Sequence, residues 1–124
     1  MEDFFEKLYA VVVHSHLKCG KPKAILAAVS GGADSVALLL LLNEMRKREN
    51  VTLLCCHVHH GLRESADFDA QFVQQVCKSL SIPFIQKNVS IQGKSNIEAK
   101  AREKRYSALK TVCLEQNMDL IATA

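Results

Sequence analysis

The stretch that decides the fold is Ala28-Val-Ser-Gly-Gly-Ala-Asp-Ser-Val-Ala-Leu-Leu-Leu-Leu-Leu42. Its polar segment Ser30–Ser35 separates an apolar run, Ala24–Val29, from an aliphatic run that turns polar only at Asn43. A short buried strand, a turn of small residues and a buried helix are typical of this pattern. The start of such a helix carries free N–H groups and the positive end of the helix dipole, so the pattern indicates an anion site, most often for phosphate.

The two glycines of this turn, Gly31 and Gly32, lack a Cβ atom, so the backbone there can bend sharply and approach a ligand. Asp34 or Ser35 would then lie at the start of the helix. The alternative interpretation is a capped strand-to-helix turn without a ligand. The sequence contains neither the Gly-x-x-x-x-Gly-Lys-Ser/Thr phosphate loop nor the Gly-x-Gly-x-x-Gly dinucleotide pattern, so spacing alone does not separate the two interpretations.

The composition is that of an ordinary globular domain. The chain has 124 residues, of which 48% are hydrophobic and 23% charged, enough for one domain with a core. A net charge of +3 permits a nucleic-acid partner without requiring one. The five cysteines include no C-x-x-C pair, which argues against a zinc ribbon or a redox dithiol and suits a reducing cytoplasm. No signal peptide is recognisable, and no apolar run is long enough to span a membrane.

Strand and helix signals alternate along the chain. Strands are predicted at residues 24–29, 52–58, 84–88 and 119–123, and helices at 2–18, 34–48, 65–80 and 96–116. Strands that alternate with helices of this length form crossover units and a parallel sheet. We therefore expect an α/β fold, a three-layer α/β/α sandwich with a Rossmann-like parallel sheet, whose ligands bind beyond the carboxyl ends of the strands.

The segment His57-Val-His-His-Gly-Leu-Arg63 follows the second predicted strand. His57 and His59 could share one face of the strand and hold a metal, but two histidines without a third ligand are weak support for such a site. A polar loop that turns at Gly61 is the simplest interpretation. The functional alternative places His60 and Arg63 in a nucleotide crevice at the sheet edge.

The last predicted helix opens with Asn96-Ile-Glu-Ala-Lys-Ala-Arg-Glu-Lys-Arg-Tyr106. At about 100° per residue, Glu98, Arg102 and Arg105 lie within roughly 60° of one another, on the stripe expected to face the core. Charges on such a stripe are costly unless they are paired or bind a ligand, so both arginines are candidates for phosphate contacts. In the structural alternative, Arg102 pairs with Glu98, and Ser95 forms a capping box with Glu98.

Together these segments resemble a known family. The loop Ser30–Ser35 is similar to the Ser-Gly-Gly-x-Asp-Ser loop of the ATP pyrophosphatases, the PP-loop superfamily, which have an adenine nucleotide alpha hydrolase-like fold. The further segments His60-Gly-Leu-Arg-Glu-Ser65, Ile82-Pro-Phe84 and Asn96–Tyr106 follow in the order found in the tRNA(Ile)-lysidine synthetase family. The resemblance covers residues 24–124, and residues 1–124 would form the N-terminal ATP-pyrophosphatase domain.

The resemblance implies a ligase that uses ATP and Mg²⁺ to join free lysine to C2 of the wobble cytidine of isoleucine tRNA, through an adenylated tRNA, with release of pyrophosphate and AMP. It implies catalytic roles for Asp34 and Arg105, with Asp34 as the Mg²⁺ ligand and Val58 at the adenine. The nucleotide-binding residues that it implies are Ser30, Gly31, Gly32, Ala33, Asp34, Ser35, Val58, His60, Arg63 and Arg102.

The family continues beyond the Thr-Ala of the fourth strand into a His-His-x-Asp-Asp segment and tRNA-binding regions. The chain stops at Ala124, so we expect a domain incomplete at its C-terminal end, inactive alone, in a cytoplasmic protein. An exposed last strand invites association, and a homodimer is one expected state. The alternatives are another PP-loop ATP pyrophosphatase, such as a tRNA thiolation enzyme or an amidotransferase synthetase, and a nucleotide-binding protein without turnover.

Overall fold

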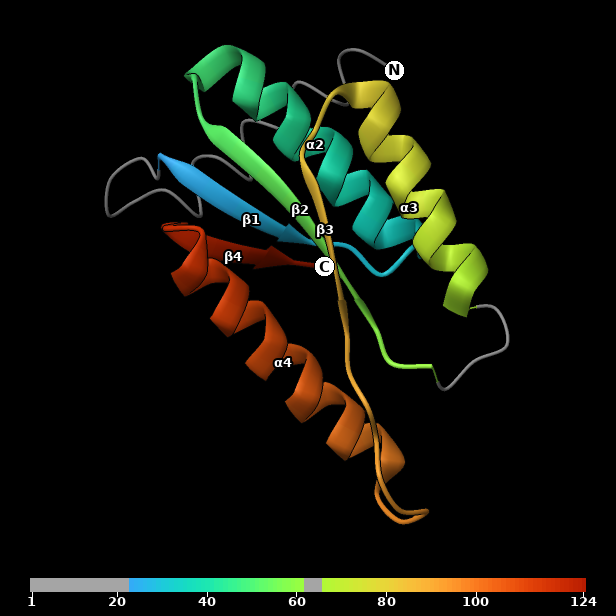
Figure 1. The fold of residues 1–124 in the computed structure, drawn as a ribbon. Helices are drawn as coiled ribbons and strands as arrows, with labels where there is room; N and C mark the ends of the chain where they lie inside the picture. The colour runs from blue at the N-terminus through green and yellow to red at the C-terminus, as the bar shows by residue number, and fades with distance from the viewer. Residues whose placement is uncertain (1–22, 62–65) are drawn as a thin grey trace.

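A four-stranded parallel sheet organises the molecule in the computed structural model, which describes residues 23–61 and 66–124 (Figure 1). The helix predicted at 2–18 and the candidate Arg63 lie outside the described residues. The strands are β1 (Ala24–Ala28), β2 (Thr52–His59), β3 (Phe84–Asn88) and β4 (Leu120–Thr123), in the order β3-β2-β1-β4. Since β1 is paired with both β2 and β4, it is a central strand, and its five residues include four that are buried.

The helices lie on both faces of this sheet. Helices α2 (Ala33–Glu49) and α3 (Ala66–Leu80) cover one face, and α4 (Ile97–Glu115) covers the other (Figure 1). The predicted parallel three-layer α/β/α fold is confirmed. Within the described residues, each predicted strand and helix is present, with ends that agree to within one residue.

The alternation of side chains along β1 explains the two cores. Ile25 and Ala27 pack with α2 and α3 against Leu39 and Val73, whereas Leu26 packs on the opposite face against α4. Successive side chains of a strand point to opposite faces, so a strand covered by helices on both sides reads as an unbroken apolar run.

The register places the carboxyl ends of three strands at one edge of the sheet. Ala28 is the partner of Cys56 on β2 and of Thr123 on β4. The chain leaves β1 at this edge and turns through the glycine pair into α2, so this edge is where the glycine turn and the end of β2 meet.

The start of α4 differs from the prediction. The residue that caps it is Asn96, in the left-handed conformation with φ 55°, and its side chain makes no capping hydrogen bond. The capping box that the structural alternative placed at Ser95 and Glu98 is therefore wrong, because the residue that caps the helix is Asn96 and not Ser95. Asparagine tolerates left-handed φ better than most residues, which explains why the turn occurs there.

None of the helices in the two described ranges is both long and apolar enough to cross a membrane.

Candidate nucleotide site

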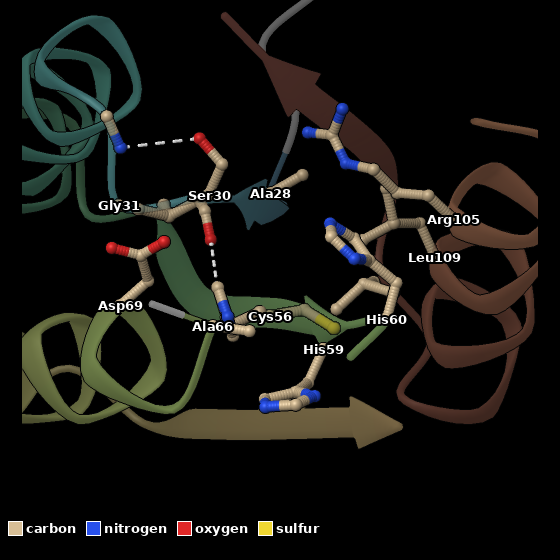
Figure 2. A pocket seen from close by; sticks show the side chains of 14 residues that line it. Ala28, Ser30, Gly31, Cys56, His59, His60, Ala66, Asp69, Arg105 and Leu109 are labelled. Atoms are coloured by element: carbon tan, nitrogen blue, oxygen red, sulfur yellow. Dashed lines mark hydrogen bonds between the residues drawn. The ribbon is translucent and has the colours of Figure 1, made fainter. Parts of the chain in front are cut away.

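A cavity of about 410 Å³ opens at the carboxyl ends of β1 and β2 (Figure 2). It is bounded by the glycine turn after β1, by the start of α3 and by the middle of α4. Ligands of open parallel sheets bind at this edge, so the cavity is the leading candidate for a functional site. Its lining consists of Ala28, Val29, Ser30, Gly31, Gly32, Cys56, His57, Val58, His59, His60, Ala66, Asp69, Arg105 and Leu109.

The Ser35 hydroxyl group fixes the glycine turn from the side that faces away from the cavity. The backbone N–H groups of Ser30 and Gly31 both donate to Ser35 Oγ at 3.2 Å, and the Ser35 hydroxyl donates to the carbonyl oxygen of Gly32 at 2.9 Å. Ser35 is buried and does not line the cavity. It therefore fixes the shape of the turn from the protein side, while Ser30, Gly31 and Gly32 face the cavity.

Gly31 is a position where glycine is required. Its φ is +102°, a conformation that L side chains rarely adopt, and a Cβ atom there would lie 3.2 Å from the Cβ of Asp69. The turn therefore combines a backbone conformation that favours glycine with close packing against the start of α3.

Helix α2 begins beside the cavity. Gly32 is its capping residue, and the first helical hydrogen bond runs from Val36 N–H to the Gly32 carbonyl. The N–H groups of Ala33, Asp34 and Ser35 therefore precede the helical ladder, as the first donors of every helix do. The side chains of Ala33 and Asp34 are exposed, and neither residue lines the cavity.

On the opposite side of the cavity lies Arg105 of α4, which is partly buried (Figure 2). Arg102, one turn earlier, is exposed and does not line the cavity, so the structure separates two arginines that helical spacing had grouped together. Both guanidinium groups lie near the Tyr106 ring, at 5.5 Å for Arg102 and 5.9 Å for Arg105. Of the two, only Arg105 is placed to meet a ligand in this cavity.

The end of β2 supplies three histidines with different surroundings. His57 is buried, and its Nδ1 lies 2.7 Å from the Val29 carbonyl oxygen. His59 Nε2 lies 2.7 Å from Oδ1 of the exposed Asp67. His60 lines the cavity on the side of Arg105 (Figure 2), and Val58 in the strand before it also lines the cavity. Within the described part of the chain, no three His, Cys, Asp or Glu side chains are grouped so that they could hold a metal ion.

Cys56 also lines the cavity, and its chemistry is constrained by its surroundings. Burial raises the pKa of the Cys56 thiol to about 11, against a smaller opposing effect of Lys87. The thiol therefore remains protonated near neutral pH, and a protonated thiol is a poor nucleophile and metal ligand.

Two cavity residues of α3, Ala66 and Asp69, were missed by the sequence analysis. In the sequence they belong to an amphipathic helix in which nothing distinguishes Asp69 from Asp67. The order of strands and helices could have predicted their position, because the helix after β2 must start at the same sheet edge as the glycine turn. Acidic residues in its first turn therefore come close to that turn.

A second hollow, of about 740 Å³, lies between the segment after β3 and the first half of α4. Lys100 and Lys104 line it together with Glu103. It contains no helix start and no glycine turn, and the Lys100 ammonium is already bonded to the Gln92 carbonyl at 3.1 Å. The first cavity is therefore the better candidate for a phosphate-bearing ligand.

Comparison with known proteins agrees with this assignment. The model of the PP-loop domain family, ATP_bind_3, matches residues 2–124. The tRNA(Ile)-lysidine synthase of Actinobacillus succinogenes is 42% identical over 100 residues, which cover 80% of this chain and 23% of that protein. The tRNA(Ile)-lysidine synthase of Petrotoga mobilis is 32% identical over 129 residues, which cover the whole of this chain and 41% of that protein. The chain thus spans less than half the length of these curated relatives.

Two solved structures share the fold at low sequence identity. The U34-tRNA thiolase NcsA from Methanococcus maripaludis superposes with a TM-score of 0.79 at 22% identity, covering 98% of this chain and 46% of that one. The NH3-dependent NAD synthetase from Campylobacter jejuni superposes with a TM-score of 0.68 at 15% identity, covering 99% and 56%. The sequence-based resemblance is confirmed, membership indicates ATP binding, and the chain belongs to the PP-loop domain family.

Proposed function

We propose that this chain is the ATP-binding part of an enzyme that makes lysidine in isoleucine tRNA. The support is the similarity to tRNA(Ile)-lysidine synthases across the whole chain, together with a cavity suited to a nucleoside triphosphate. In the proposed reaction, the C2 oxygen of the wobble cytosine attacks the α-phosphorus of ATP and pyrophosphate leaves. The amine of free lysine then attacks C2, and AMP leaves with the oxygen.

The observation that carries the nucleotide assignment is that Gly31 and Arg105 line opposite sides of one cavity. Backbone N–H groups at the start of α2, which precede the hydrogen-bond ladder of the helix, can donate to phosphate oxygens, and a guanidinium group binds phosphate with charge-assisted hydrogen bonds. The same cavity is lined by apolar groups of Ala28, Val58 and Leu109, which suit the faces of an adenine ring.

In this proposal the residues of the chain bind and orient the triphosphate. Arg105 stabilises the negative charge that develops on the leaving pyrophosphate, the type of contribution that preorganised charges make to catalysis. Asp34, in the first turn of α2, is the proposed ligand of Mg²⁺, which neutralises phosphate charge when bound. His60, which lines the cavity, and Arg63 stay as proposed nucleotide contacts, whereas Arg102, which does not line the cavity, is no longer proposed as one.

The competing activity is tRNA thiolation, which the fold also permits. Lysidine formation is preferred because the similar curated proteins are tRNA(Ile)-lysidine synthases, and because burial raises the pKa of the Cys56 thiol, so that this cavity residue does not supply a free thiolate near neutral pH. We propose isoleucine tRNA and free lysine as the partners, a cytoplasmic location, and a homodimer as an assembly that the edge strand β4 would permit.

The test has two stages. Equilibrium dialysis of the 124-residue chain with labelled ATP and Mg²⁺ should show binding, and an Arg105→Ala variant should show less. Pyrophosphate release by the complete gene product should then require both lysine and an isoleucine tRNA with a wobble cytidine. A matched tRNA with uridine at that position is the control. Release that needs a sulfur donor in place of lysine would contradict lysidine formation, and undetectable ATP binding would contradict the nucleotide assignment.

A further inference from the structure

The carboxylate of Asp69 lies against the glycine turn, in the cavity assigned above to the triphosphate. An ideal Cβ atom on Gly31 would be 3.2 Å from the Asp69 Cβ and 3.6 Å from its Oδ1. Figure 2 shows this carboxylate beside Gly31, on the side of the cavity opposite Arg105. An acidic side chain thus occupies the wall of a cavity whose other features favour an anion.

Among the described residues, the carboxylate has no partner that would neutralise it. Within residues 23–61 and 66–124, Asp69 accepts no hydrogen bond and forms no ion pair, in contrast to Asp67 two residues earlier, which contacts His59 at 2.7 Å. Asp69 is also partly buried rather than fully solvated. Its charge is therefore available to whatever enters the cavity.

A phosphate next to this carboxylate would be repelled. Two like charges at contact distance repel each other, and they do so more strongly at the lower effective dielectric constant near a protein surface than in bulk water. A divalent cation between the two groups reverses the sign of this interaction. Mg²⁺ is commonly held by one or two carboxylates together with the phosphates of a substrate.

The position of Asp69 also distinguishes it from Asp34, the carboxylate that the sequence analysis selected as the metal ligand. Asp34 is exposed on the first turn of α2 and does not line the cavity, whereas Asp69 does. A cation that accompanies phosphates inside the cavity would meet Asp69 there.

We propose that Asp69 contacts the divalent cation carried by the bound triphosphate, and that it makes nucleotide binding in this cavity depend on the cation. This inference rests on the proposed nucleotide site. In the absence of the cation, Asp69 disfavours binding of free ATP, and in its presence Asp69 contributes a ligand.

The experiment measures the Kd of ATP by calorimetry twice for each protein, with excess Mg²⁺ and with EDTA. For the unmodified chain we expect much tighter binding with Mg²⁺. For Asp69→Asn we expect weaker binding with Mg²⁺ but tighter binding with EDTA, so that the ratio of the two Kd values falls about tenfold or more. Loss of a purely structural contact would weaken binding in both conditions. Asp67→Asn removes the same charge from the same helix turn outside the cavity, and it should leave the ratio unchanged.

Circular dichroism establishes that each variant is folded, and Asp69→Ser provides a second neutral polar residue at this position. A measurement without substitution uses Mn²⁺ with ATP, which should broaden the amide NMR signals of Gly31 and Asp69 and leave that of Glu115, at the far end of α4, sharp. An unchanged Kd ratio in the Asp69 variants, cation-independent binding by the unmodified chain, or a sharp Asp69 signal would overturn the inference. Absence of ATP binding under all conditions would instead overturn the nucleotide site itself, and the inference with it.

Discussion

His57 Nδ1 lies 2.7 Å from the main-chain carbonyl oxygen of Val29, the last residue before the glycine turn. A carbonyl group only accepts hydrogen bonds, so Nδ1 must carry the proton and donate it. The bond is buried and joins residues 28 positions apart in the sequence. It ties the exit of β1 to β2 at the point where the chain turns into the cavity, and it therefore helps to set the position of the whole loop.

Replacing His57 tests how much this hydrogen bond contributes to stability. His57→Phe keeps an aromatic ring but removes the donor and leaves the Val29 carbonyl without this partner, which should lower the free energy of unfolding by about 1–3 kcal/mol. Urea denaturation measures the change. His59→Phe is the matched control, because His59 bonds to the exposed Asp67, and it should cost less than about 1 kcal/mol. Equal losses of unfolding free energy in the two variants would show that the buried hydrogen bond to Val29 contributes no more than the exposed contact of His59.

Ser35→Ala separates the shape of the loop from its contacts with ligand. The substitution removes the acceptor shared by the N–H groups of Ser30 and Gly31, and it should cost about 1 kcal/mol of stability. Because these N–H groups would then be free to reorient, we expect ATP to bind roughly tenfold more weakly. Dialysis and thermal melts on the same sample measure both quantities. Unchanged affinity together with lowered stability would mean that the shape of the turn does not depend on this hydroxyl.

Arg105→Ala should weaken ATP binding about 10- to 100-fold, since a hydrogen bond to a charged group contributes roughly 1.5–3 kcal/mol. The melting temperature should change little, because the guanidinium group lines a cavity rather than the core. Lys110→Ala removes the same charge from an exposed position on α4 and serves as the control. A large loss of stability with unchanged affinity would favour a structural role for Arg105.

The protonated state of Cys56 predicts slow thiol chemistry. With a pKa of about 11, roughly one thiol in a thousand is ionised at pH 8, so iodoacetamide should modify Cys56 far more slowly than the less buried Cys113. The rate at Cys56 should rise as the pH approaches 11, because the thiolate fraction grows with pH up to the pKa. Fragment-ion mass spectrometry distinguishes Cys56 from its neighbour Cys55. Rapid alkylation of Cys56 at pH 7 would contradict the raised pKa of this thiol. It would show that Cys56 can act as a thiolate, and it would favour the alternative function in tRNA thiolation.

Local sequence pattern was sufficient to predict every strand and helix in the described residues, because buried strands covered on both faces leave a short unbroken apolar run and an amphipathic helix such as α3 leaves a periodic one. The same reasoning found the glycine turn as a candidate anion site, while spacing alone left open a capped turn without a ligand. It failed at the start of α4, where Asn96 adopts a left-handed conformation that a spacing rule does not foresee.

The tertiary structure decided which residues line the cavity. Helical spacing grouped Arg102 with Arg105, but only the packing of α4 on the sheet shows that Arg105 alone of the two reaches the cavity. Asp69 is 38 positions from Gly31 along the chain, and no local rule connects them. Their contact depends on how the crossover from β2 lays the start of α3 beside the turn that follows β1. Local interactions are encoded over a few residues and can be read directly, whereas a cavity joins segments that only the completed fold brings together.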